Sequence, residues 1–303
     1  MLVSMQSLMA HAKAHQYAVG YFESWNLESM LAVKDAAEAL NAPVIIGVNG
    51  TFVGNPERRV PEEIAHYAKL GRAIAENAKV PMALLLNEAE DENILIRGLR
   101  EGFNAIMYAE EGAPLDKTVA VNQYIVRAAH ACGAAVEAEV GELPTADIAK
   151  GTLSQGELTD PDQAAWFVRE TNVDALAVAV GNVHLLEGRT SSLNFALIEE
   201  LARRVSVPLV LHGGTGVSEP DFRRAIELGM CKVNVGTVMK RAWLDTIRAY
   251  LGSHDVDHMD PHDVIGKGGD LDVLMAARQA VMDTVVRFMR IIGCEGQAGK
   301  RGM

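Results

Sequence analysis

The sequence predicts a (β/α)8 barrel, an α/β fold in which eight parallel strands are each followed by a helix. Two observations carry this prediction. Short apolar runs alternate with longer segments of helical periodicity along the whole chain, and about eight such runs can be counted. Most runs are continuously hydrophobic, which is typical of parallel strands covered on both faces. Eight strand–helix units favour a closed barrel over a doubly wound open sheet, the main structural competitor.

The predicted strands are short and recur along the whole chain. They lie at residues 17–22, 43–48, 81–86, 104–108, 134–140, 174–180, 207–211 and 231–235. Segments with the spacing of amphipathic helices lie between them, for example at 27–40, 62–78 and 219–229. This alternation is the pattern expected of repeated βα units.

Additional helices are expected at both ends of the barrel. Residues 1–16 have amphipathic spacing, and a further amphipathic helix is predicted at 273–292. Two long polar segments, 141–160 and 252–272, interrupt the alternation and are predicted to be functional or mobile loops. Neither marks a domain boundary, so one domain is expected over residues 1–303.

Composition excludes several classes of protein. The 303-residue chain has a formal net charge of −12, which argues against nucleic acid as a partner. No apolar run approaches the roughly 18 residues of a membrane span, and a cytoplasmic protein is expected. The cysteines Cys132, Cys231 and Cys294 are widely separated, which indicates buried thiols rather than disulfides or a thiolate zinc site.

Candidate metal ligands lie where predicted strands end, because a barrel assembles its active site at the C-terminal ends of its strands. His184 and His212 follow the sixth and seventh strands, and Glu137 and Glu139 lie near the end of the fifth. Imidazole and carboxylate groups suit zinc, manganese, cobalt or ferrous iron. The alternative is that each histidine only caps a strand or bonds the backbone.

Two glycine-containing turns indicate a phosphate site. Converging backbone N–H groups bind anions where a glycine-rich loop meets a helix, and barrels often place such loops after strands seven and eight. The alternative is that both are merely tight turns. The candidate contacts, including one glycine after strand six, are Gly181, Gly213, Gly214, Thr215, Asn234, Gly236 and Thr237.

Several motifs occur in the order found in class II fructose- and tagatose-bisphosphate aldolases, which the chain resembles over nearly its whole length. These motifs are YAVGYF with NLE (26–28), APVIIGV, VEAEVGEL, LTDP (158–161), AVAVGNVH, VPLVLHGGTGV and KVNVGT. The resemblance implies a lyase with a divalent metal, normally Zn2+. The metal polarises the carbonyl of dihydroxyacetone phosphate and stabilises the resulting enediolate. It also implies a phosphorylated sugar substrate and a homodimer or homotetramer.

Carried over residue by residue, the resemblance makes His184 and His212 metal ligands and matches Glu139 to a glutamate of the family. The third strand departs from the pattern. Where the family has leucine–aspartate–histidine, supplying the acid–base group and a ligand, this chain has Leu86, Asn87 and Glu88. Glu88 can still ligate a metal, but an amide cannot exchange a proton as a carboxylate does.

Three functions are therefore compatible with the sequence. The protein could be an aldolase for an unusual phosphorylated ketose, with Glu88, Glu90 or Glu110 as the acid–base group. It could catalyse related enolate chemistry, such as isomerisation or decarboxylation of a phosphorylated sugar or acid. It could also be a non-catalytic binding or assembly subunit.

Arg58 and Arg59 are candidates for a second phosphate site, although solvated surface charge is the simpler interpretation.

Overall fold

The computed structural model of the chain describes residues 1–141, 144, 146–147, 152–153, 156–183 and 192–300. Within these residues eight parallel strands close into a barrel, in the order β1-β10-β9-β8-β5-β4-β3-β2. The barrel strands are β1 Val19–Glu23, β2 Val44–Asn49, β3 Met82–Ala89, β4 Ala105–Tyr108, β5 Ala135–Val140, β8 Ala175–Val178, β9 Leu209–Leu211 and β10 Met230–Val235. The predicted fold is confirmed, and each strand overlaps one of the predicted apolar runs, with β3 extending three residues past the predicted end.

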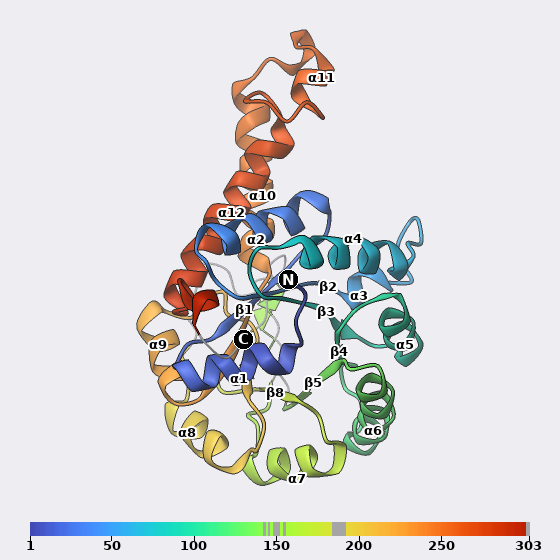
Figure 1. The fold of residues 1–303 in the computed structure, drawn as a ribbon, viewed down its shortest axis with the longest axis vertical. Helices are drawn as coiled ribbons and strands as arrows, with labels where there is room; N and C mark the ends of the chain where they lie inside the picture. The colour runs from blue at the N-terminus through green and yellow to red at the C-terminus, as the bar shows by residue number, and fades with distance from the viewer. Residues whose placement is uncertain (142–143, 145, 148–151, 154–155, 184–191, 301–303) are drawn as a thin grey trace.

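Helices surround the barrel (Figure 1). Those that follow strands are α2 Leu27–Ala39, α3 Gly50–Val53, α4 Ile64–Asn77, α5 Glu92–Glu101, α6 Leu115–Ala131, α7 Pro161–Thr171, α8 Phe195–Arg204, α9 Glu219–Glu227 and α10 Thr237–Ser253. The additional elements are α1 Met5–His15, α11 Pro261–Val264, α12 Val273–Ile291 and two short 3-10 helices, η1 Val256–His258 and η2 Gln297–Gly299. No described helix is both long and apolar enough to cross a membrane.

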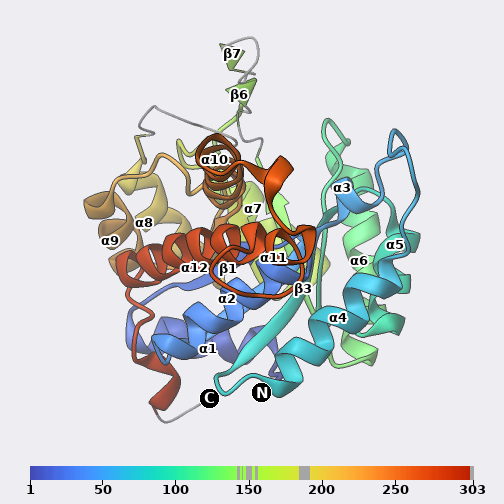
Figure 2. The same cartoon turned by 90° about the horizontal axis from the view of Figure 1, so that it is seen from above.

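The strands are buried because both of their faces are covered. Every residue of β2 is buried, and the same holds for β4, β8, β9 and β10. This explains why the strands appear in the sequence as continuous apolar runs instead of alternating ones. Helix α1 lies across the end of the barrel where both chain termini are found (Figures 1 and 2).

Two segments predicted to be long loops contain short elements. The first carries a small antiparallel ladder, β6 Ala146–Asp147 with β7 Thr152–Leu153, at the end of the barrel opposite the termini (Figure 2). The second, between α10 and α12, contains η1 and α11. Together α10, α11 and α12 form an arm that extends away from the barrel (Figure 1).

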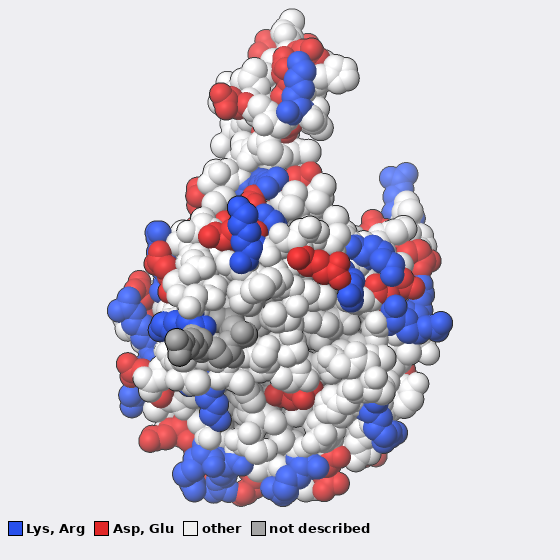
Figure 3. Space-filling model, in the orientation of Figure 1, with Lys and Arg blue, Asp and Glu red and all other residues white. Residues whose placement is uncertain are grey.

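Charge and cysteine placement complete the description. On the face drawn in Figure 3, acidic and basic residues are interspersed around the rim, and its described residues form no continuous basic patch.

Cys231 and Cys294 are buried thiols as predicted, but Cys132 is exposed, so the prediction was wrong there. Cys132 is the C-cap of α6, and the chain turns toward solvent at this point.

One glycine fixes how closely two barrel strands can approach. A Cβ built on Gly47 in β2 would lie 1.8 Å from the backbone oxygen of Leu85, its register partner in β3. We expect Gly47→Ala to lower the free energy of unfolding by about 3 kcal/mol, because the obstacle is backbone and cannot rotate away. Urea unfolding followed by circular dichroism measures the effect.

The matched control is Gly252→Ala near the end of α10, where a Cβ would meet no atom within 4 Å. That substitution removes backbone entropy from the unfolded chain and is expected to be neutral or stabilising by up to about 1 kcal/mol. Equal unfolding curves for the two variants would contradict the proposed close approach of β2 and β3.

Candidate active site at the barrel mouth

A cavity of about 740 Å³ opens where the barrel strands end. The residues that line it include one at or just beyond the C-terminal end of each of seven described strands: Glu23 in β1, Asn49 in β2, Glu88 in β3, Tyr108 in β4, Glu139 in β5, Gly213 after β9 and Asn234 in β10. The position agrees with the rule used to select candidate residues from the sequence.

A break in the strand ladder brings Asn87 and Glu88 to the cavity. The register between β3 and β4 shifts between Leu86 and Ala89, so two residues of β3 do not pair regularly. Glu88 adopts a left-handed backbone conformation with φ of 51°, which is uncommon outside glycine. Such irregularities re-aim side chains, and here both Asn87 and Glu88 line the cavity.

Contacts from β2 and α3 hold Glu88 in this conformation. The Asn49 amide nitrogen donates to Glu88 Oε2 at 2.7 Å, and the Thr51 hydroxyl donates to the Glu88 backbone oxygen at 2.6 Å. Asn49 also caps α3 by accepting from the Phe52 N–H. Oε2 of Glu88 is therefore bound to Asn49, and Oε1 faces the ring of His212.

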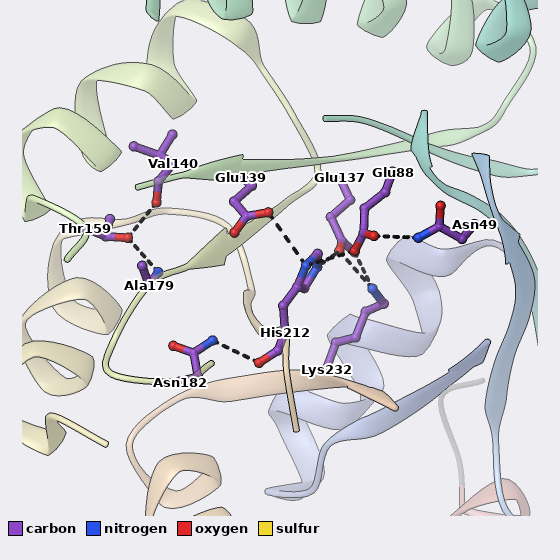
Figure 4. Close-up of polar contacts among 10 residues, drawn as sticks. All are labelled: Asn49, Glu88, Glu137, Glu139, Val140, Thr159, Ala179, Asn182, His212 and Lys232. Carbon is purple, nitrogen blue, oxygen red and sulfur yellow. Dashed lines mark hydrogen bonds and ion pairs between the residues drawn. The ribbon is translucent and has the colours of Figure 1, made fainter. Parts of the chain in front are cut away.

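His212 lies behind the cavity lining, fully buried, with carboxylates on both sides of its ring (Figure 4). Its Nε2 is 3.0 Å from Glu137 Oε1. Its Nδ1 faces two carboxylates of the cavity lining, 3.3 Å from Glu88 Oε1 and 3.7 Å from Glu139 Oε2. The backbone oxygen of His212 accepts from the Asn182 amide at 2.9 Å, so both the ring and the main chain are held.

A buried ion pair fixes the carboxylate behind His212. Lys232 Nζ lies 2.8 Å from Oε1 and 2.7 Å from Oε2 of Glu137, and all three side chains are fully buried. The Lys232 ammonium also lies over the Tyr21 ring, 5.1 Å from its centroid. Burial opposes ionisation of Glu137, but the charges of Lys232 and His212 outweigh it and hold the pKa of Glu137 below its usual value.

The electrostatics of this cluster favour positive charge at its centre. Burial alone would lower the pKa of His212, but Glu137, Glu139 and Glu88 outweigh it and raise that pKa to about 10. Burial raises the pKa of Glu139 to about 7, an effect that His212 opposes and that Glu88 and Glu137 reinforce. Three carboxylates around one imidazole thus stabilise a cation between them.

The residue types at this position fit a divalent metal. An imidazole nitrogen and two carboxylates are common zinc ligands, and a carboxylate behind the ligand histidine fixes which ring nitrogen faces the metal. Glu88 and Glu139 both approach Nδ1 of His212, and the fourth predicted ligand, His184, lies outside the described residues. Among the residues that are described, no three His, Cys, Asp or Glu are already arranged in ligand geometry.

The predicted phosphate contacts lie together at one side of the cavity. Gly213 adopts φ of 62°, and a Cβ on Gly214 would be 3.0 Å from the Asn234 backbone oxygen, so both positions suit glycine. Thr237 begins the 17-residue helix α10, whose first N–H groups favour anions. The predicted contacts that line the cavity are Gly213, Gly214, Thr215, Asn234, Gly236 and Thr237.

Gly181 is the exception among the predicted phosphate contacts, because it is not part of the cavity lining. It has φ of 99°, and a Cβ there would lie 2.3 Å from the Ser192 backbone oxygen. A tight turn at the end of the sixth strand accounts for this glycine. The two arginines considered for a second phosphate, Arg58 and Arg59, do not line the cavity either.

Sequence reasoning missed several residues that shape the site. It assigned no role to Lys232, although a lysine within the apolar run of β10 is a signal of a buried partner. It noted Glu137 only as a carboxylate near Glu139, and the two-residue spacing does place both on the inner face of β5. It gave no role to Asn49, whose contact with Glu88 crosses between two strands.

Comparisons with known proteins support one family. The model of the family described as "Fructose-bisphosphate aldolase class-II" matches residues 3–297. The chain belongs to the class II fructose-bisphosphate aldolase family. The D-tagatose-1,6-bisphosphate aldolase subunit GatY of Klebsiella oxytoca is 32% identical over 297 residues, which cover 98% of this chain and 99% of that protein.

Solved structures of aldolases share the fold. The YdjI aldolase of Escherichia coli K12 has a TM-score of 0.81 and 28% identity, covering 98% of this chain and 100% of the other. The fructose-bisphosphate aldolase of Campylobacter jejuni, at 19% identity, has a TM-score of 0.74 over 98% of this chain and 97% of that one, a likeness of fold alone. The predicted class, a lyase acting on phosphorylated ketoses, is confirmed. Members of the family are generally zinc-dependent.

The Lys232–Glu137 pair generates a stability prediction for this family member. Lys232→Met removes the ammonium that pairs with the buried Glu137 carboxylate. Because the carboxylate stays buried without this partner, we expect a loss of about 3–5 kcal/mol in the free energy of unfolding. Urea unfolding measures it. The control is the double substitution Lys232→Met with Glu137→Leu, which removes both charges and should recover most of that loss. A single variant as stable as the parent would contradict the buried pairing.

Proposed function

We propose that the protein is a zinc-dependent aldolase that makes or breaks the carbon–carbon bond beside the carbonyl of a phosphorylated ketose, with dihydroxyacetone phosphate as one partner. One observation carries this proposal. The glycine-rich turns after β9 and β10 line the same cavity as Glu88 and Glu139, the two carboxylates that contact the buried His212. A phosphate and a polarised carbonyl of one small molecule can therefore be held together there.

The metal ligands in this proposal are Glu88, Glu139, His184 and His212. Bound zinc supplies Lewis-acid polarisation of the substrate carbonyl. The protein contributes orientation: Glu137 holds His212 through Nε2, so that Nδ1 faces the cavity, and Asn49 holds one oxygen of Glu88, so that the other faces the same point. Such outer contacts typically tune metal affinity 10- to 100-fold, roughly.

Substrate phosphate is bound in this proposal by the backbone N–H groups around Gly213, Gly214 and Gly236 and by the hydroxyls of Thr215 and Thr237. The substrate oxygens near the carbonyl meet two amides. The Asn234 side chain is 8% exposed and lacks a hydrogen-bond partner at both polar atoms within the described structure. The Asn87 side chain is 2% exposed and likewise lacks a partner at Oδ1.

Glu90 is the proposed acid–base group. Of the three carboxylates considered for this role, Glu88 is held by Asn49 and faces His212. Glu110 accepts from Lys117 Nζ at 2.7 Å and from the Tyr108 hydroxyl. Glu90 follows β3 directly, lines the cavity and is exposed to solvent, so its carboxylate can take up and return a proton.

We also propose a homodimer or homotetramer. The arm formed by α10, α11 and α12 extends from the barrel and carries exposed aliphatic side chains at Leu244, Leu251 and Ile265, which are 55%, 53% and 57% exposed. A second copy of the chain would cover such residues. Sedimentation of the purified protein measures the state.

The proposed function is tested by exchange of the C3 proton of dihydroxyacetone phosphate in D2O, followed by NMR. Exchange is expected with zinc and is expected to stop with a chelator. Glu90→Gln should lower the exchange rate roughly 10²- to 10⁴-fold, the usual contribution of a general base. Absence of exchange in zinc-loaded protein would contradict the proposal and favour the non-catalytic alternative.

A second prediction separates ligand from base. Glu88→Gln removes a ligand charge, so we expect zinc affinity to fall by more than about 100-fold, beyond what loss of an outer contact costs. Glu90→Gln is the matched control, being the same chemical change in the same cavity, and should retain zinc. Zinc content after dialysis against a competing chelator measures both. Normal zinc content in Glu88→Gln would instead assign Glu88 to proton transfer.

A further inference from the structure

The cavity lining is strongly acidic. Its described residues include seven glutamates, while Lys240 is the one lysine and no arginine is among them. The charge of Lys240 is already used, because its Nζ forms an ion pair with Glu23 and lies 4.3 Å from the centroid of the Phe52 ring. A second phosphate in the same cavity would need its own donors, either a cation or converging N–H groups such as those proposed for the first phosphate.

The anion-binding turns and many of these glutamates lie on opposite sides of the barrel mouth. In the closed order β1-β10-β9-β8-β5-β4-β3-β2, β10 lies across the ring from β4, and β9 lies across from β3. Glu90 follows β3, and Glu110 and Glu111 follow β4. A substrate with its phosphate on the β9–β10 side and its carbonyl near His212 therefore extends toward Glu90, Glu110 and Glu111.

The far side of the cavity is the part lined by Glu90, Glu110 and Glu111, and basic residues near it bind other partners. Arg58 donates to the Phe52 backbone oxygen at 3.1 Å and pairs with Glu62 at 2.7 Å. Lys117 is bound to Glu110, 2.7 Å from Oε1. Neither Arg58 nor Lys117 is part of the cavity lining.

Hydrogen bonding on this side also favours hydroxyl groups. Carboxylates are acceptors, and so is the buried Asn87 Oδ1, which has no partner within the described structure. A sugar hydroxyl can donate to all of them. A phosphate dianion offers only acceptors and brings charge of the same sign, which is repelled where the local dielectric is low.

We propose that the aldehyde partner of this enzyme is an unphosphorylated polyhydroxyaldehyde, so that the cleaved substrate is a ketose 1-phosphate with an uncharged far end. The inference rests on the proposed aldolase function. In the condensation, dihydroxyacetone phosphate loses a C3 proton, its C3 bonds to the aldehyde carbon, and the aldehyde oxygen gains a proton. This substrate has one phosphate, whereas the relative from Klebsiella oxytoca is named for a ketose with two, tagatose 1,6-bisphosphate.

The test compares aldehydes that share a carbon skeleton and differ only in the phosphate. Zinc-loaded enzyme condenses dihydroxyacetone phosphate with glyceraldehyde or glyceraldehyde 3-phosphate, and with erythrose or erythrose 4-phosphate, and kcat/KM is measured for each aldehyde. The uncharged member of a pair is expected to exceed the phosphorylated member by about tenfold or more, the effect of placing like charges close together. Equal rates, faster phosphorylated aldehydes, or no condensation with any uncharged aldehyde would overturn the inference.

A charge reversal locates the cause. Glu111→Lys adds a cation to the far side of the cavity and should shift the kcat/KM ratio about tenfold toward the phosphorylated aldehyde. Glu199→Lys is the matched control, because it makes the same charge change on α8, outside the cavity lining, and should leave the ratio unchanged. An equal shift in both variants would mean that net charge, not the cavity, sets the preference, and would overturn the inference.

The proton-exchange measurement separates the two proposals. Exchange together with a preference for phosphorylated aldehydes retains the aldolase function and rejects the uncharged substrate. In that case the second phosphate is bound by a cation outside the described residues, for which Arg189 is the candidate. Absence of exchange in zinc-loaded enzyme rejects the aldolase function, and the inference about its substrate falls with it.

Discussion

The ion pair between Lys232 and Glu137 is the interaction on which the geometry of the cavity depends. Both groups lie inside the barrel with no exposed surface, so neither charge could be tolerated there alone. Their pairing leaves Glu137 ionised and fixed, and Glu137 in turn determines which nitrogen of His212 faces the cavity. A charged network of this kind contributes little net stability, and its value lies in orienting one imidazole.

A second constraint acts at the end of β3. The left-handed Glu88 and the broken pairing with β4 let two consecutive residues reach the cavity, where a regular strand would direct alternate side chains to opposite faces. The replacement of the usual aspartate and histidine by Asn87 and Glu88 therefore keeps both side chains at the centre of the site while changing their chemistry. The proposed aldolase reaction then needs another carboxylate for proton transfer.

The sequence predicted the fold well because strands that are buried on both faces appear in the sequence as continuous apolar runs. It predicted that His212 and Glu139 lie close together, because strand ends converge in any barrel. It could not predict the partner of Lys232, since Glu137 is 95 residues away and only the closed ring brings them together. The apolar run also ends at Leu86, so the sequence predicted that β3 ends there. The polar residues Asn87 and Glu88 lie in the irregular part of the strand and do not continue that pattern.

The separation of the turns after β9 and β10 from those after β3 and β4 has an evolutionary consequence. Strands on opposite sides of the ring do not pair with each other, so substitutions in the turn after β4 can alter the far end of the cavity without altering the turns after β9 and β10. Loops tolerate such changes better than strands do. A barrel of this design can diversify its products by drift at one rim while the chemistry at its centre stays under constant selection.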